Sequence, residues 1–141
     1  MEEKLITAYH EAGHAIACLY FGDTFEYATI RDSQPMVANP IHGNEEQCFV
    51  TMLAGPAVEY KLGHISVGDD NLDLFFKFED EKPRKEAKFL FDKYTKIANL
   101  IFTSENGIDT TWWRKTILLA EELHSKETMS YQEVYNLVMN E

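Results

Sequence analysis

The sequence lacks the features that mark secreted and membrane-spanning proteins. It has only two cysteines, Cys18 and Cys48. Two are too few for a disulfide framework and they form no C-x-x-C pair, so we expect reduced thiols in a cytoplasmic protein. The first residues lack a basic region followed by an apolar run, so we expect no signal peptide. No apolar stretch reaches the roughly 18–20 residues that cross a bilayer.

Basic side chains are also scarce. Lysine and arginine total 13 against 24 aspartates and glutamates, which gives a formal net charge of -11. An acidic surface repels phosphate backbones and anionic lipid headgroups, so we expect neither nucleic acid nor a membrane as a partner. None of the seven glycines belongs to a G-x-x-x-x-G-K-[ST] phosphate-binding loop. We therefore expect any activity of this chain to be independent of ATP.

The composition is that of an ordinary globular protein. Hydrophobic residues make up 45% of the 141 residues and charged residues 26%. This length and composition predict a single compact domain over residues 1–141. A chain of this size can bury a core without disulfide bonds.

Hydrophobic spacing predicts a mainly helical fold with a small β-sheet. The first helix is expected over residues 2–21, is apolar on every side and should therefore be buried. Gly22 is its expected end. Residues 25–31 and 36–38 read as strands. Further helices are expected over residues 44–61, from a start among 69–71, from 83 to the turn at 106–107, over 111–124 and over 131–139.

The second expected helix carries two local signals. Asn44 can cap its first turn, and Gln47 three residues later fits a capping box. The small residues 54–57 would let this helix approach Gly13 of the first helix closely. We therefore expect the two helices to pack together.

The segment His10-Glu11-Ala12-Gly13-His14 is the strongest chemical signal. Histidines four positions apart share one face of a helix, so both imidazoles can reach one ion. Leaving such polar groups buried and unpaired would cost roughly 1–3 kcal/mol each, and a metal ion satisfies them together. We predict a Zn²⁺ site with His10 and His14 as ligands and Glu11 as the general base.

A catalytic zinc needs a third protein ligand. The residues alone leave several candidates, and acidic ones at a helix start can equally serve as helix caps. Glu59 is a candidate to accept a hydrogen bond from a ligating imidazole. The candidate third ligands are Asp69, Asp70, Asp73, His42, His64 and His124.

Three blocks of the sequence resemble a known family. Residues Thr7–Ala15 are similar to the start of the peptidase domain of FtsH-type membrane AAA+ proteases. Residues Leu53–Glu59 resemble that domain's second helix, although the larger proteases usually have arginine where Pro56 stands. Residues His64–Gly68 resemble the segment that leads to the family's third zinc ligand. The resemblance extends from Thr7 to Asp73.

The resemblance implies that the third ligand is an aspartate. One inserted residue after Gly68 aligns Asp73 with the family's ligand, and an apolar residue follows it as in the family. Asp70 is the alternative, because Asp69-Asp70 resembles the paired aspartates of some short relatives. The stretch from Trp112 to Val138 is similar in pattern to stand-alone relatives that lack the ATPase.

The function implied is that of a zinc-dependent, ATP-independent peptidase. Glu11 would accept a proton from the attacking water and pass it to the leaving amine. We expect short peptides, chain termini or unfolded protein segments as substrates. The strand at residues 25–31 is our candidate to hold an extended peptide by strand addition.

Two other classes of function stay open. The chain could be a non-catalytic metal-binding or adaptor domain, or a helical protein-interaction domain. Aromatic residues along the long helix after Pro83 would suit a homo-oligomer surface. They are Phe89, Phe91, Tyr94 and Phe102. The presence of Glu11 favours the peptidase, because a binding-only site needs no base.

Overall fold

The computed structural model describes residues 1–31, 33–64, 80 and 82–140. Within these residues the fold is mainly helical with a small antiparallel sheet, as the sequence predicts. No helix in the described part is long and apolar enough to cross a membrane. The helix expected from residues 69–71 lies outside it. The helices are α1 (Glu3–Phe21), α2 (Glu45–Lys61), α4 (Arg84–Phe102), α5 (Thr111–Lys126) and α6 (Tyr131–Met139). The strands are β1 (Tyr27–Thr29), β2 (Met36–Ala38) and β3 (Thr128–Ser130).

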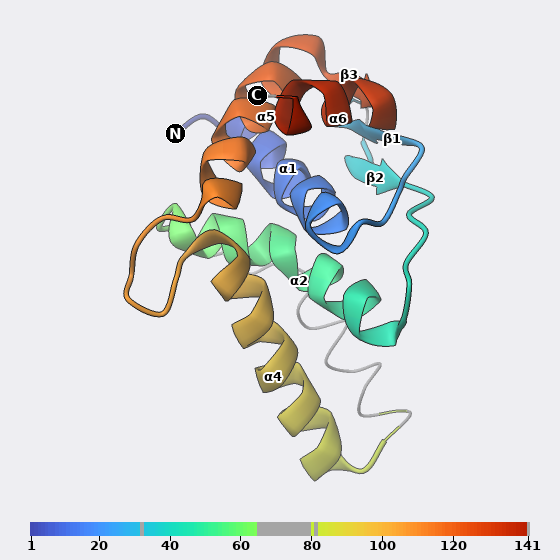
Figure 1. Ribbon diagram of the computed structural model, residues 1–141, viewed down its shortest axis with the longest axis vertical. Helices are drawn as coiled ribbons and strands as arrows, with labels where there is room; N and C mark the ends of the chain where they lie inside the picture. The colour runs from blue at the N-terminus through green and yellow to red at the C-terminus, as the bar shows by residue number, and fades with distance from the viewer. Residues whose placement is uncertain (32, 65–79, 81, 141) are drawn as a thin grey trace.

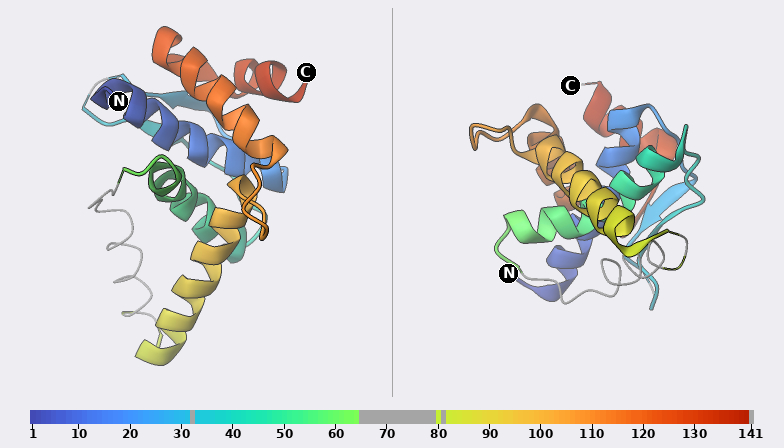
Figure 2. Two further views of the ribbon diagram at one scale, coloured as in Figure 1. Left: turned by 90° about the vertical axis from the view of Figure 1, so that its left-hand side faces the viewer. Right: turned by 90° about the horizontal axis from the view of Figure 1, so that it is seen from below.

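Helix α1 lies at the centre of the molecule. It packs against α2 on one side and α5 on the other, and it also contacts β1 and β2 (Figures 1 and 2). Ala8, Ala12 and Ile16 are fully buried, which confirms that this helix is internal. Gly22 ends it in the left-handed conformation with φ 76°, as expected for a glycine after the last turn.

The sheet has the order β2-β1-β3, and all of its pairs are antiparallel. In β1, Tyr27 is opposite Ala38 of β2 and Ser130 of β3. The expectation that residues 25–31 receive an extended peptide is therefore wrong, because both sides of β1 already pair with neighbouring strands. Strand β3 was not anticipated, since its three residues between two helices show no periodicity of their own.

Local capping signals set several helix boundaries. The side chain of Asn44 accepts a hydrogen bond from the Gln47 N–H at 2.9 Å, as predicted. The Gln47 side chain, however, accepts from the Gly43 N–H at 2.9 Å rather than from Asn44. At α6 the capping box between Ser130 and Glu133 is complete, with both bonds at 3.1 Å.

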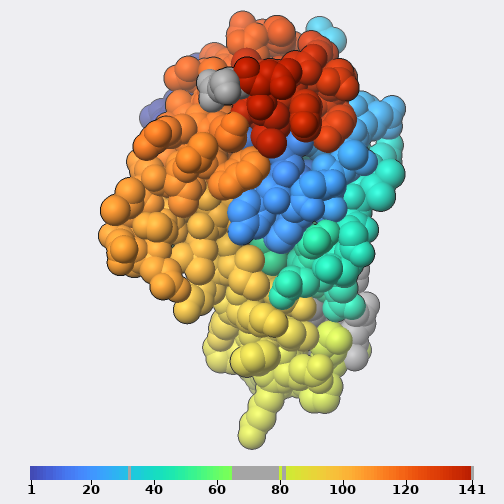
Figure 3. Space-filling model, in the orientation of Figure 1, coloured from blue at the N-terminus to red at the C-terminus, as the bar shows by residue number. Residues whose placement is uncertain are grey.

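Helix α4 extends away from α1 and α5, and its N-terminal half forms the narrow lower end of the molecule (Figures 2 and 3). Tyr94 and Phe102 are buried in the protein's own core, and Phe91 packs partly against it. Phe89 is 64% exposed. The proposed aromatic surface for an oligomer is thus reduced to Phe89, because the other three side chains are used internally.

The contact between α1 and α2 depends on the absence of a side chain at Gly13. A Cβ atom there would lie 2.8 Å from the carbonyl oxygen of Ala54 and 2.8 Å from Cγ2 of Val58. The backbone of α2 therefore occupies the space that a side chain would need. This confirms the expected packing of the small-residue run of α2 on Gly13.

Replacing Gly13 with alanine should push the two helices apart. We expect Gly13→Ala to lower the free energy of unfolding by about 1–3 kcal/mol, the usual cost of overpacking a core. Urea denaturation followed by circular dichroism measures this. Lys4→Ala is the control on the exposed part of α1, where loss of a surface ion pair should cost about 0–1 kcal/mol. Equal stability of the two variants would contradict the packing argument.

Candidate metal site

Three side chains of α1 converge next to α2. The Nε2 atoms of His10 and His14 are 3.0 Å apart. Ligand atoms of His10, Glu11 and His14 all lie within 4.8 Å of one another. The three residues that the sequence motif singles out are therefore brought together, and Glu11 is only 5% exposed.

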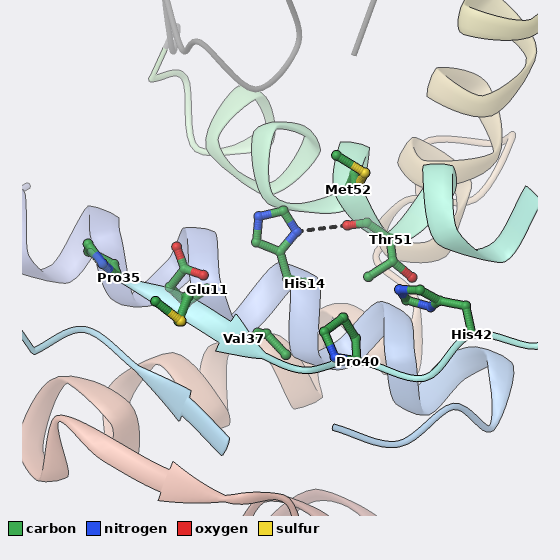
Figure 4. Close-up of a pocket in the computed structure, with 9 residues that line it drawn as sticks. Glu11, His14, Pro35, Val37, Pro40, His42, Thr51 and Met52 are labelled. Atoms are coloured by element: carbon green, nitrogen blue, oxygen red, sulfur yellow. Dashed lines mark hydrogen bonds between the residues drawn. The ribbon is translucent and has the colours of Figure 1, made fainter. Parts of the chain in front are cut away.

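Each imidazole is oriented by an acceptor from α2. The Nδ1 atom of His14 lies 2.7 Å from the backbone oxygen of Thr51 (Figure 4). A carbonyl oxygen can only accept, so this nitrogen carries the proton and donates. The Nδ1 atom of His10 lies 2.7 Å from Oε1 of Glu59. In both rings, Nε2 is therefore the nitrogen that can bind an ion.

Glu59 is an ionised carboxylate that accepts the hydrogen bond from His10. It is 7% exposed. Burial by itself raises the pKa of the Glu59 carboxyl, but hydrogen bonds from His10 and His64 outweigh burial and hold the pKa below its ordinary value. Its second oxygen lies 3.0 Å from Nδ1 of His64. An ionised Glu59 accepts from His10, fixes its tautomer and raises the basicity of its Nε2.

This arrangement directs two nitrogen lone pairs toward each other. When Nδ1 carries the proton in both rings, the Nε2 atoms of His10 and His14, 3.0 Å apart, are both acceptors, and one cation can bind to both. Two nitrogens at 2.0–2.1 Å from a tetrahedral zinc ion are about 3.3 Å apart. A small movement of the rings would therefore accommodate Zn²⁺. A proton shared by the two rings is the metal-free alternative.

Gly55 of α2 leaves the space for this convergence. A Cβ atom at Gly55 would lie 2.5 Å from Nε2 of His14 and 2.8 Å from Nε2 of His10. The sequence identified the run around Gly55 as a packing surface only. The structure adds that Gly55 keeps the ligand atoms of both histidines accessible.

A pocket of about 370 Å³ opens beside the histidines. Figure 4 shows Glu11 and His14 on α1, with His14 pointing toward Thr51 of α2 and the segment that carries Val37 and Pro40 running alongside. Most of the residues that line it are apolar, and the polar ones are Glu11, His14, His42 and Thr51. Its lining residues are Glu11, His14, Pro35, Met36, Val37, Pro40, His42, Thr51 and Met52.

The predicted third ligands have different outcomes. Asp69, Asp70 and Asp73 lie outside the described residues, so the aspartate ligand stays a prediction. The remaining candidates, His42, His64 and His124, stand apart from the group formed by His10, Glu11 and His14. They pair instead with Asp23, Glu59 and Glu2, respectively.

Cys18 and Thr51 lie close to His14 and have different roles. Cys18, one turn beyond His14, is fully buried, and burial raises the pKa of its thiol to about 12. Cys18 is therefore a neutral thiol that packs in the core. Thr51 was missed, because it contributes a backbone carbonyl and no residue type signals that.

Comparison with known proteins adds no relative. No model of a known protein family matches this sequence, and no curated protein matches it either. The geometry of the site and the sequence motif therefore carry the evidence for function.

Gly55→Ala should impair metal binding with little loss of helical structure. The new Cβ atom would overlap Nε2 of both histidines, while alanine itself favours the helix by about 1 kcal/mol over glycine. We expect affinity for Zn²⁺ to fall by more than ~10-fold, the scale of even an indirect change at a metal site. Competition titration with a zinc chelator measures the affinity, and circular dichroism checks the fold. Unchanged affinity would show that the ion, if any, binds away from Gly55.

Proposed function

We propose that this protein is a zinc-dependent peptidase that hydrolyses peptide bonds without ATP. The observation that carries the proposal is the convergence of the His10 and His14 Nε2 atoms at 3.0 Å beside Glu11. Both rings are held in this orientation by acceptors on another helix. A pair of histidines that served only to fill the core would not need Glu11 in the same pocket.

The protein's residues have distinct roles in this proposal. His10 and His14 would hold the ion, and Glu59 and the Thr51 carbonyl would keep their rings aligned. Bound Zn²⁺ would supply a Lewis acid and lower the pKa of a water molecule toward about 7. Glu11, whose side chain lines the pocket, would accept a proton from the attacking water and donate it to the leaving amine.

The substrate would lie along β2. Among the described residues β2 pairs only with β1, and Met36 and Val37 line the pocket beside Glu11. An extended peptide could therefore add to this edge by backbone hydrogen bonds. Strand β2, rather than residues 25–31, is thus the proposed partner of an extended peptide. Substrates would be short peptides or unfolded segments, because none of the 141 residues forms an ATP-binding loop.

Membership of the FtsH-type family is part of the same proposal. It is supported by the resemblance of Thr7–Ala15 and Leu53–Glu59, whose residues His10, His14, Gly55 and Glu59 meet in the structure. The protein would act in the cytoplasm, because its two cysteines are too few for the disulfide framework of a secreted domain. The runner-up is a metal-binding adaptor that uses the same pocket without catalysis.

Glu11→Gln separates the peptidase from the adaptor. The amide cannot take a proton, so we expect hydrolysis to be abolished while zinc stays bound at about one ion per chain. Mass spectrometry of tag-free protein gives the zinc content, and unfolded casein serves as the substrate. Wild-type protein that binds zinc but cleaves nothing would favour the adaptor. If no metal binds at all, the histidine pair shares a proton and the zinc proposal is wrong.

The third ligand can be found by comparing two aspartates. Asp73→Ala should weaken zinc binding by more than ~10-fold, because two histidines alone hold a catalytic ion poorly. Asp70→Ala should cost at most a helix cap, about 1 kcal/mol of stability. Zinc affinities of both variants are measured side by side. If only Asp70→Ala weakens zinc binding, Asp70 is the third ligand. If neither variant weakens it, His64 is the next residue to replace.

A further inference from the structure

A second ordered histidine faces the same pocket. The Nδ1 atom of His42 lies 3.0 Å from Oδ2 of Asp23, and the side chain of His42 is only 12% exposed. The other oxygen of Asp23 accepts from the Gly43 N–H at 3.3 Å. Asp23 therefore holds both the ring and the backbone of the segment that leads into α2.

The position of Asp23 is unfavourable for a carboxylate in other respects. It follows Gly22 at the C-terminal end of α1, and its N–H donates to the carbonyl of Cys18 at 2.8 Å. A helix C-terminus carries partial negative charge, which disfavours an acid there. Asp23 is also 7% exposed, so it has lost most of its hydration. The bonds to His42 and Gly43 offset both costs.

The pairing determines which atom of His42 can meet a ligand. Because Nδ1 is paired with Asp23, Nε2 is the nitrogen that His42 has left for a ligand, and His42 lines the pocket together with Glu11 and His14. Figure 4 shows Glu11 and His42 on opposite sides of His14 along this pocket. His42 thus lies further along the pocket than the proposed reaction centre.

The backbone next to His42 cannot continue the β2 edge. Asn39 after β2 adopts a positive φ of 50°. Pro40 has no N–H to donate. The Ile41 N–H already donates to the carbonyl of Thr24 at 2.8 Å. A peptide bound along β2 would therefore lose main-chain partners at this point, where the His42 side chain is the next polar group lining the pocket.

We propose that His42 is a substrate-binding residue that hydrogen-bonds the main chain of the peptide where the β2 edge ends. Its Nε2 makes a hydrogen bond to the peptide where the β2 backbone can no longer make one. Asp23 is the positioning residue that orients the ring of His42. The inference rests on the proposed peptidase function and adds a subsite to it. A peptide must continue past the end of β2 at Ala38 to reach His42, so a peptide of several residues gains this contact and a very short one does not.

Peptide hydroxamates of two lengths test this subsite without requiring turnover. The hydroxamate group chelates zinc, and the attached peptide is either two or five residues long. Because either strand direction is conceivable, one series extends on the amino side of the chelator and one on the carboxyl side. Dissociation constants are measured by calorimetry on zinc-loaded wild-type protein, His42→Ala, Asp23→Asn and the control His124→Ala.

We expect the wild-type protein to bind the five-residue compound of one series more tightly than the two-residue one. His42→Ala should lose roughly three- to tenfold of that affinity, the scale of one hydrogen bond, with the short compound unaffected. Asp23→Asn should lose part of the extra affinity that the wild type has for the five-residue compound. His124→Ala, a surface histidine paired with Glu2, should match the wild type.

Three results would overturn the inference. If His42→Ala weakens both lengths equally, His42 supports the fold rather than the peptide. If it weakens neither, His42 does not contact the ligand, and the peptidase proposal still stands because the short chelator binds. If no hydroxamate binds zinc-treated wild-type protein, the metal site fails and this subsite fails with it.

Discussion

The close approach of α1 and α2 is the constraint on which the rest of the structure depends. Gly13 on α1 and Gly55 on α2 remove the side chains that would keep the helices apart. As a result, the Thr51 carbonyl and the Glu59 carboxylate come within 2.7 Å of the two imidazoles. The same contact therefore builds the core and fixes the orientation of the candidate ligands.

The electrostatics of the site follow from this contact. An acceptor is placed at the Nδ1 atom of each ring, so the Nε2 atoms of His10 and His14 come within 3.0 Å of each other. Nitrogen atoms oriented in this way by hydrogen bonds at Nδ1 are what a histidine-ligated metal needs. Glu59, ionised despite burial, and the nearby Glu11 place negative charge beside that point.

Local signals made much of the fold predictable. The bounds of α1 and α6 follow closely from a terminal glycine and a capping box, both of which act within a few residues. The sheet was predicted less well, because strand pairing joins residues about a hundred positions apart, such as Tyr27 and Ser130. That β1 is the central strand, and hence unable to receive a peptide, has no local signature.

The sequence by itself determined that His10 and His14 share one helix face, with Glu11 beside it, because the helical repeat brings positions i and i+4 together. Only the tertiary structure decided what surrounds them. In the folded protein, Gly55 leaves space beside the Nε2 atoms of both histidines. His42 lies in the pocket that Glu11 and His14 also line. These partners come from segments distant in the chain, and their positions depend on how closely the helices pack, which no residue spacing encodes.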